Sequence, residues 1–152
     1  MKFSASTFAG LLSMSSLAAA RITGITLPKQ LAAGQNFTAF LNTEGYIQSI
    51  ADVSVAFGAA PAEYAYEKTL GTAVLGEKTL GSELSNVVRN ISLPLSVPAD
   101  FQKGEAVVTA ALFSLTGARY SPALSYFNVT VDVADVTDAS EFVQSSGVIN
   151  VY

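Results

Sequence analysis

Apolar and polar residues alternate along most of the chain after Arg21, and β-branched and aromatic residues dominate the apolar positions. A period of two residues predicts β-strands, and the clusters of Gly, Pro, Asn and Ser between the runs predict turns. The strands expected from this pattern cover residues 22–27, 36–43, 49–57, 72–75, 87–97, 105–115 and 123–133. We therefore predict an all-β domain, an immunoglobulin-like or fibronectin-III-like β-sandwich of about seven strands, with a closed barrel as the alternative architecture.

The alternation also assigns the face of each strand that points into the core. In the strand that begins at residue 49, Val53, Val55 and Phe57 are expected to point inward. Pro28 is expected to end the first strand, because a Pro offers no N–H group to a neighbouring strand. Pro94 indicates an edge strand or a bulge for the same reason.

The N-terminus has the pattern of a secretory signal peptide. Lys2 gives a positively charged start, a loosely apolar stretch follows, and three Ala residues end at Ala20. Small residues at this point are typical of a cleavage site, so cleavage is expected between Ala20 and Arg21. The continuous apolar stretch is shorter than the roughly twenty residues that a membrane-spanning helix needs. Residues 1–20 are therefore predicted to be a leader that is removed during secretion.

The remaining chain is expected to form one domain followed by a short tail. Residues 21–134 are assigned to the β-sandwich. In residues 135–152 the alternation first weakens and then resumes, so this C-terminal tail is either a final edge strand or a docking segment. The tail is too short and too polar for a lipid-anchor signal, and no membrane anchor is expected.

Three glycosylation sequons agree with a secreted protein. They begin at Asn36, Asn90 and Asn128, and none has Pro at its middle position. In each case the Asn precedes an apolar residue of the predicted strand pattern, which places the Asn on the opposite face. Glycans at these positions would point into solvent.

Composition excludes several kinds of chemistry. The 152 residues contain no His, no Cys and no Trp, so Ser-His-Asp triads, Cys-His pairs and the usual zinc and haem ligands are absent. No metal or cofactor is expected. The formal net charge of −4 becomes −5 when Lys2 leaves with the leader, and the basic residues that remain are scattered singly. Nucleic acids and anionic membranes are therefore poor partners.

Two side-chain patterns have a catalytic or metal-binding interpretation and a simpler alternative. Tyr64 and Lys68 have the Tyr-x-x-x-Lys spacing of short-chain dehydrogenases, but no Gly-rich dinucleotide motif precedes them. Asp132, Asp135 and Asp138 could gather at the end of a sandwich and hold calcium, yet they do not form an EF-hand loop and fit a solvated acidic connector. No pair of acids is singled out for hydrolysis, so no enzymatic activity and no small-molecule substrate are expected.

Exposed apolar side chains are the remaining candidates for function. Tyr46 and Ile47 follow a Gly in an expected loop, where they would either form a contact patch or close the end of the sandwich. Phe142 and Tyr152 in the tail are further candidates. We expect these four residues to contact a protein partner.

A set of segments spread in order over nearly the whole mature chain resembles the fungal necrosis-inducing secreted protein effectors. These segments are Gly45–Ser49, Asp52–Gly58, the paired Leu70-Gly71 and Leu80-Gly81, Ser85-Asn86, Val97-Pro98, Gly104–Val107, Ala110–Leu115, Tyr120–Pro122 and Phe127–Val131. No catalytic motif accompanies the resemblance.

The resemblance implies a secreted fungal effector and virulence factor. Such a protein would bind plant immune receptor-associated kinases and suppress pattern-triggered immunity, and some family members also cause host cell death. It would be released outside the fungus and act inside host plant cells or at their plasma membrane. The alternative functions are a secreted cell-wall or adhesion module and an uncharacterised carboxylate hydrolase.

Overall fold

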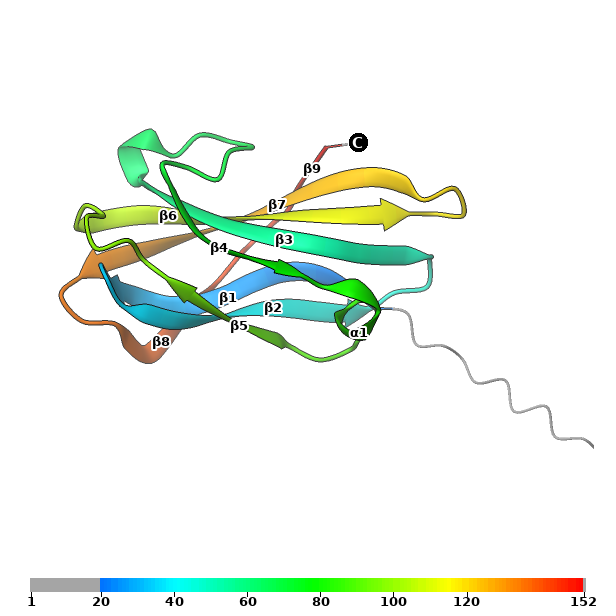
Figure 1. Ribbon diagram of the computed structural model, residues 1–152, viewed down its shortest axis with the longest axis horizontal. Coiled ribbons are helices and arrows are strands. Elements are labelled where there is room, and N and C mark those ends of the chain that lie inside the picture. The colour runs from blue at the N-terminus through cyan, green and yellow to red at the C-terminus, as the bar shows by residue number, and fades with distance from the viewer. Residues whose placement is uncertain (1–19, 152) are drawn as a thin grey trace, which may run out of the picture.

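The computed structural model describes residues 20–151, and these fold into nine β-strands with two short helical turns (Figure 1). The strands are β1 (Ala20–Ala32), β2 (Asn36–Gly45), β3 (Ile50–Pro61), β4 (Ala73–Thr79), β5 (Ile91–Ser96), β6 (Gly104–Thr116), β7 (Ser121–Ala134), β8 (Asp138–Gln144) and β9 (Ile149–Val151). The turns are the 3-10 helix η1 (Ala62–Tyr64) and the α-helix α1 (Gly81–Leu84). The prediction of an all-β chain is confirmed. The expected leader up to residue 19, and Tyr152, lie outside the described residues.

The strands form one continuous sheet in the order β4-β3-β6-β7-β1-β2-β5. β1 joins the two halves of the sheet because it changes partner along its length. Its first half pairs antiparallel with β2, and its end, Gln30 to Ala32, pairs in parallel with β7. The sheet thus wraps around a core and is nearly closed. The finer assignment to an immunoglobulin-like or fibronectin-III-like sandwich stays a prediction.

The two ends of the sheet, β4 and β5, approach each other through side chains. Gly76 of β4 has a φ of +155°, and a Cβ atom built there would lie 2.8 Å from Leu95 Cδ2 of β5. A larger residue at this position would be strained by the positive φ and would require the Leu95 side chain to move. β5 is an end strand of the hydrogen-bonded path, so the interpretation of Pro94 as an edge residue is confirmed.

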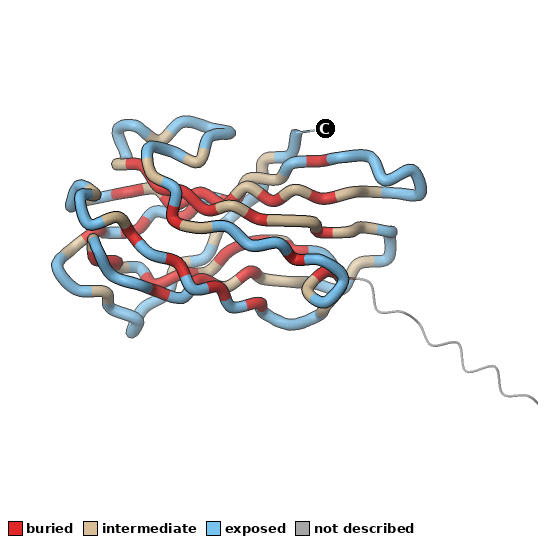
Figure 2. The backbone as a smooth tube through the Cα atoms, in the orientation of Figure 1, coloured by how far each residue is buried: buried red, intermediate tan, exposed pale blue. Residues whose placement is uncertain are grey.

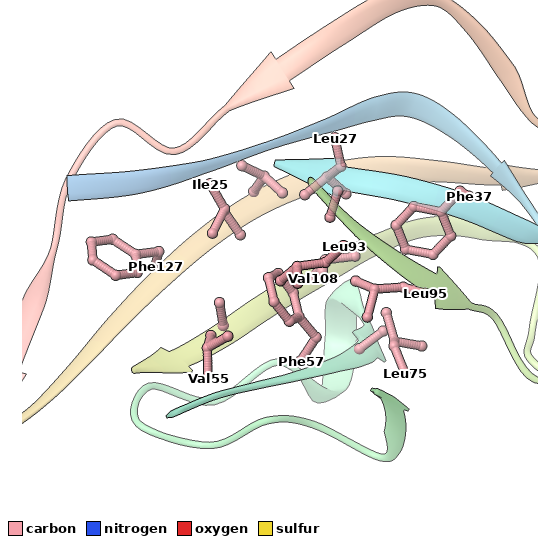
Figure 3. Packing of buried hydrophobic residues seen from close by; sticks show 14 of the residues in the cluster. Ile25, Leu27, Phe37, Val55, Phe57, Leu75, Leu93, Leu95, Val108 and Phe127 are labelled. Carbon is pink, nitrogen blue, oxygen red and sulfur yellow. The ribbon is translucent and has the colours of Figure 1, made fainter. Parts of the chain in front are cut away.

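The core lies between the two halves of the sheet and is built from buried residues of β1 to β7, which alternate most regularly with exposed ones in β5 and β7 (Figure 2). Phe57, Val108 and Leu75 from β3, β6 and β4 face Leu27, Leu93 and Phe37 from β1, β5 and β2 (Figure 3). Removing a Leu or Phe side chain of this kind from water contributes about 1.5–3 kcal/mol to stability. The described chain contains no Cys, so this packing and the sheet hydrogen bonds hold the fold together without disulfides.

Pro28 does not end the first strand, as the sequence suggested. β1 continues through it to Ala32, and Pro28 is buried opposite Phe142 of β8. The β1–β8 register shifts between Pro28 and Gln30, and a ladder that is irregular at this point tolerates the missing N–H.

Asp52, and not Val53, points into the core. Asp52 of β3 lies opposite Ser114 of β6, and the next pair is Ser54 with Phe113, so Val53 is an extra residue in the ladder. Such a bulge exchanges the inward and outward faces of the strand for the residues between the bulge and the start of the strand. As a result Asp52 is 2% exposed and Val53 is half-buried.

Two further strands differ in length from the prediction. β4 extends to Thr79, four residues beyond the predicted end of this strand at residue 75. β5 begins at Ile91, and the preceding residues 87–90 form a connection from α1. Cross-strand packing against β3 and β2, which the local pattern does not reveal, sets these bounds.

The tail contributes two strands that pair with different parts of the sheet. β8 runs antiparallel to β1, and β9 pairs with residues 124–126 of β7. Ser145 fixes the turn between them, because its N–H donates to Ile25 O at 2.9 Å and its Oγ accepts from Ile25 N at 3.0 Å. Neither helical turn within residues 20–151 is long and apolar enough to cross a membrane.

Candidate interaction surface

The connection from β2 to β3, residues 46–49, forms an exposed loop at one end of the molecule, together with α1 and the turn between β6 and β7 (Figure 1). Gly45 ends β2, and Ile47 projects from the loop with 99% of its surface exposed. The loop is nevertheless ordered by hydrogen bonds. Tyr46 Oη donates to Gln48 Oε1 at 2.8 Å, and Gly117 N donates to Ser49 O at 2.9 Å.

Tyr46 and Ile47 have different environments although they are adjacent. The Arg21 guanidinium carbon lies 4.6 Å from the centroid of the Tyr46 ring, which is a cation–π contact. Such a contact contributes about 0.5–1 kcal/mol at an exposed site. Tyr46 is therefore held half-buried against the start of β1, where it covers part of the end of the sheet. Ile47 covers nothing and is free to contact a partner.

Buried hydrogen bonds centred on Asp52 support the loop from below. Asp52 Oδ1 accepts from Ser114 Oγ at 2.7 Å, and Oδ2 accepts from Ile22 N at 3.2 Å. The Asp52 N–H donates to Ser85 Oγ at 3.0 Å. One residue thereby connects β1, β3, β6 and the end of α1. Within residues 20–151 no buried side-chain polar atom lacks a partner.

Burial raises the pKa of the Asp52 carboxyl above its usual value of 3.8, while the hydrogen bonds from Ser114 and Ile22 partly oppose the rise. A perturbed carboxyl in a cleft can indicate a catalytic acid. Here both carboxylate oxygens already accept hydrogen bonds, and the residue is 2% exposed. The arrangement holds strands together and leaves no face of the carboxyl open to a substrate.

An open groove of about 860 Å³ runs beside Ile47, between the start of β3 and α1. Its lining is mostly apolar or uncharged and includes Ile50, Val53, Ser82 and Val87. Leu80 N donates to Val53 O at 2.9 Å and holds α1 against the sheet, so the groove has a fixed wall. An exposed aliphatic side chain beside such a groove is the kind of surface that forms the centre of a protein interface.

The four predicted contact residues do not form one patch. Tyr46 and Ile47 lie next to the start of β1, where Ala20 pairs with Gly45. Phe142 lies beside Pro28, eight residues further along β1, which at about 3.3 Å per residue is about 26 Å away. The Phe142 ring is half-exposed and makes an edge contact with Phe40, with 6.1 Å between ring centroids. Tyr152 lies outside the described residues.

The sequon asparagines are exposed, with Asn36 at the start of β2, Asn90 just before β5 and Asn128 within β7. The apolar residue that follows each of them is buried. At the predicted cleavage point, Ala20 is 1% exposed as the first residue of β1, and Arg21 is exposed. Glycan attachment and cleavage at these positions stay predictions.

The acidic tail residues have partners of their own. Asp135 forms an ion pair with Lys103, and Asp138 Oδ1 accepts from Ser140 N at 2.8 Å. The side chain of Ser140 and then its backbone N–H lower the pKa of Asp138. Across residues 20–151, no three His, Cys, Asp or Glu side chains are grouped so that they could hold a metal ion.

Sequence reasoning identified the exposed loop but missed the groove and its buried support. The signal for the support was present, since Asp52 is the one charged residue of its strand. A charge at such a position indicates either an outward face or a partnered interior site. Its partners, Ser85 and Ser114, are far away in the sequence and could not be recognised from spacing.

Comparisons with known proteins identify relatives across most of the chain. A family model described as the Nis1 family matches residues 18–132. Necrosis-inducing secreted protein 1 of Colletotrichum orbiculare is 51% identical over 128 residues, which are 84% of this chain and 78% of that protein. The protein of the same name from Colletotrichum higginsianum is 46% identical over 137 residues, which are 90% and 94% of the two chains. Among solved structures, a superoxide reductase (neelaredoxin) from Ignicoccus hospitalis aligns with a TM-score of 0.49 and 10% identity over 76% of this chain and 82% of that chain.

Proposed function

Because the chain belongs to the Nis1 family, we propose that it is a secreted fungal effector that acts on host plants. Two relatives at 46–51% identity are named necrosis-inducing secreted proteins, and their names supply the secreted location and a role in host cell death. The signal-peptide pattern in residues 1–20 and the exposed sequons support the same location.

The proposed activity is stoichiometric binding of plant immune receptor-associated kinases, which suppresses pattern-triggered immunity. The kinase partner comes from the family resemblance. The observation that supports binding is the fully exposed Ile47 beside an open groove, on a loop whose base is fixed by buried hydrogen bonds. The fixed base limits the conformational entropy that the loop loses on binding, and this favours affinity. A stable complex would bury about 1,200–2,000 Å² in total.

Under this proposal the protein is not an enzyme. The acid with the raised pKa, Asp52, is buried and fully occupied by hydrogen bonds from β1 and β6. The ion-paired acids Glu141 and Asp135 are bound to Lys29 and Lys103 at the surface. Inhibition would therefore require one effector molecule for each kinase molecule, and no cofactor.

The test is a binding and phosphorylation assay with purified mature protein, residues 21–152, and the cytoplasmic domain of a plant immune receptor-associated kinase. We expect a one-to-one complex at micromolar concentrations or below and a fall in kinase autophosphorylation as effector is added. A kinase variant without catalytic activity should bind equally well, because binding does not depend on phosphate transfer. Failure to form a complex, or inhibition by catalytic amounts of effector, would refute the proposal.

Exposed aromatic rings favour a second candidate, a cell-wall binding module. Tyr64 and Tyr66 are 50% and 70% exposed on the segment after β3. Rings of this kind can stack on sugars. A pull-down with insoluble cell-wall polysaccharides separates the candidates, since the effector proposal predicts no retention and a wall-binding module predicts retention that is lost when both Tyr residues are changed to Ala.

A further inference from the structure

A second, smaller cavity opens at the same end of the molecule, beside Tyr46. Its volume is about 150 Å³, and it lies between the start of β1, the end of β6, the start of β7, and β9. We propose that this cavity binds a small organic monocarboxylate with an apolar body. The inference is independent of kinase binding and assigns a ligand site that the effector proposal does not require.

The inner wall of the cavity is apolar. It is formed by Ile22, Leu112 and Phe127, together with Ile50 and Ala123. Phe127 stands at the edge of the core cluster, so its ring is shared between the core and the cavity (Figure 3). A volume of about 150 Å³ is enough for one benzene-sized group. The body of the ligand is therefore a single ring or a short branched chain.

The hydroxyl groups of the lining have already committed their protons to protein acceptors. Ser114 Oγ donates to Asp52, Ser125 Oγ donates to Asn150 Oδ1 at 2.7 Å, and Thr116 Oγ1 donates to Ser121 O. The bond from Ser125 fixes the orientation of the Asn150 amide and leaves its Nδ2 as a donor. The lining thus offers donors from Asn150 and from the Arg21 guanidinium, which suits a ligand head group made of acceptors.

The charge of the lining also favours a ligand with an anionic head group. Arg21 is its one ionised side chain, and no Asp or Glu is part of it. Among residues 20–151 the ion pairs are Lys29 with Glu141 and Lys103 with Asp135, so Arg21 is in neither. Its guanidinium is held in place over the Tyr46 ring. Cleavage after Ala20 would add the α-ammonium group of Arg21 at the same mouth. A carboxylate is the head group that matches a fixed guanidinium and an amide donor.

The experiment is a titration of the mature protein with benzoate, followed by chemical-shift changes of its backbone amides. Benzyl alcohol, which has the same ring and no charge, is the matched neutral probe. We expect saturable benzoate binding with a dissociation constant of about 1 mM and shifts centred on residues 112, 125 and 127. Benzyl alcohol should bind about tenfold more weakly, because a charge-assisted hydrogen bond is lost.

Three variants make the assignment specific. Arg21→Gln removes the guanidinium and leaves the α-ammonium group, so it should narrow the difference between the two probes, whereas Lys29→Gln, which removes a surface cation elsewhere, should leave it unchanged. Ala123→Leu should fill the cavity and remove binding of both probes, and Ala123→Val is the milder version if the larger side chain prevents folding. Equal affinity for the two probes, unchanged binding by a folded Ala123 variant, or no saturation up to about 10 mM would overturn the proposal.

Discussion

At the scale of single residues, Asp52 is the side chain on which the candidate surface depends. Its carboxylate accepts from Ile22 N and Ser114 Oγ, and its own N–H donates to Ser85 Oγ. Leaving any of these buried partners unsatisfied costs about 1–3 kcal/mol. The geometry of the exposed loop above is therefore set by a residue that is itself buried.

The first prediction concerns the pH dependence that Asp52 gives to stability. Because the pKa of Asp52 is raised in the folded state, the folded protein holds this proton more tightly than the unfolded chain. The stabilising contribution is present below pH 3.8 and is lost as the pH rises through the folded-state pKa. Asp52→Asn cannot titrate. We expect the difference between the free energies of unfolding of the wild type and of the variant, measured by urea denaturation, to fall as the pH rises over this range. A difference that rises with pH would show that folding lowers the pKa of Asp52.

The second prediction concerns glycine. A Cβ atom at Gly58 would lie 2.3 Å from Leu70 O, a backbone atom that cannot move without shifting the loop before β4. Gly58→Ala should lower the free energy of unfolding by at least about 2 kcal/mol. Gly45→Ala is the matched control, since its Cβ meets no atom within 4 Å, and it should stay within about 0.5 kcal/mol of the wild type. Equal effects in urea denaturation would contradict the packing described for β3.

Residue patterns predicted the exposed loop but not the buried network below it. Alternation correctly placed Val55 and Phe57 inside, and the Gly before Tyr46 correctly indicated a loop. The same rule failed at Val53 because a single extra residue in β3 exchanges the two faces of the strand. A bulge is stabilised by its cross-strand partners, here Ser114 and the N–H of Ile22, which local sequence does not contain.

At the scale of elements, β1 organises the sheet because it pairs with three other strands. It is hydrogen-bonded to β2 at its start, to β8 in its middle and to β7 at its end. The sequence predicted a shorter strand, since Pro28 normally stops a ladder. Long-range pairing with β8 accommodates Pro28 at an irregular position, and the residues on β8 could not be matched to β1 from periodicity alone.

The third prediction tests how β8 is held against β2 across β1. Phe40 of β2 and Phe142 of β8 make an edge-to-face contact with 6.1 Å between centroids. A double-mutant cycle with Phe40→Leu and Phe142→Leu should give a coupling free energy of about 0.5–1.5 kcal/mol in urea denaturation. A cycle of Phe142→Leu with Val74→Ala on β4 is the control and should be additive within about 0.5 kcal/mol. Additivity of the Phe pair would mean that the contact does not stabilise β8.

At the scale of the whole molecule, packing and sheet hydrogen bonds hold the core together without disulfides. The polar faces of the strands and one end of the molecule stay exposed. The absence of Cys fits a protein that stays folded in both oxidising and reducing surroundings. A secreted effector with a target inside the host cell would meet both.

The fourth prediction concerns glycosylation of the whole chain. Thr38, Ser92 and Thr130 complete the three sequons and are exposed, so glycans fit without disturbing the core. Protein secreted from a yeast host should run as a ladder above the unmodified mass and collapse to one band with a glycosidase. Replacing each of these residues by Ala should remove one step of the ladder. A single band that the glycosidase does not shift would contradict the prediction.

The most direct test of the account is the affinity of the mature protein for a plant immune receptor-associated kinase when one exposed apolar residue is changed. Ile47→Asp introduces a charge beside the groove at a position that is 99% exposed, so the fold should be unaffected. Val74→Asp is the matched control on β4, where Val74 is 68% exposed. We expect Ile47→Asp to weaken binding at least about thirtyfold and Val74→Asp to change it less than about twofold. Unchanged affinity for Ile47→Asp would show that the partner binds elsewhere and would contradict the account.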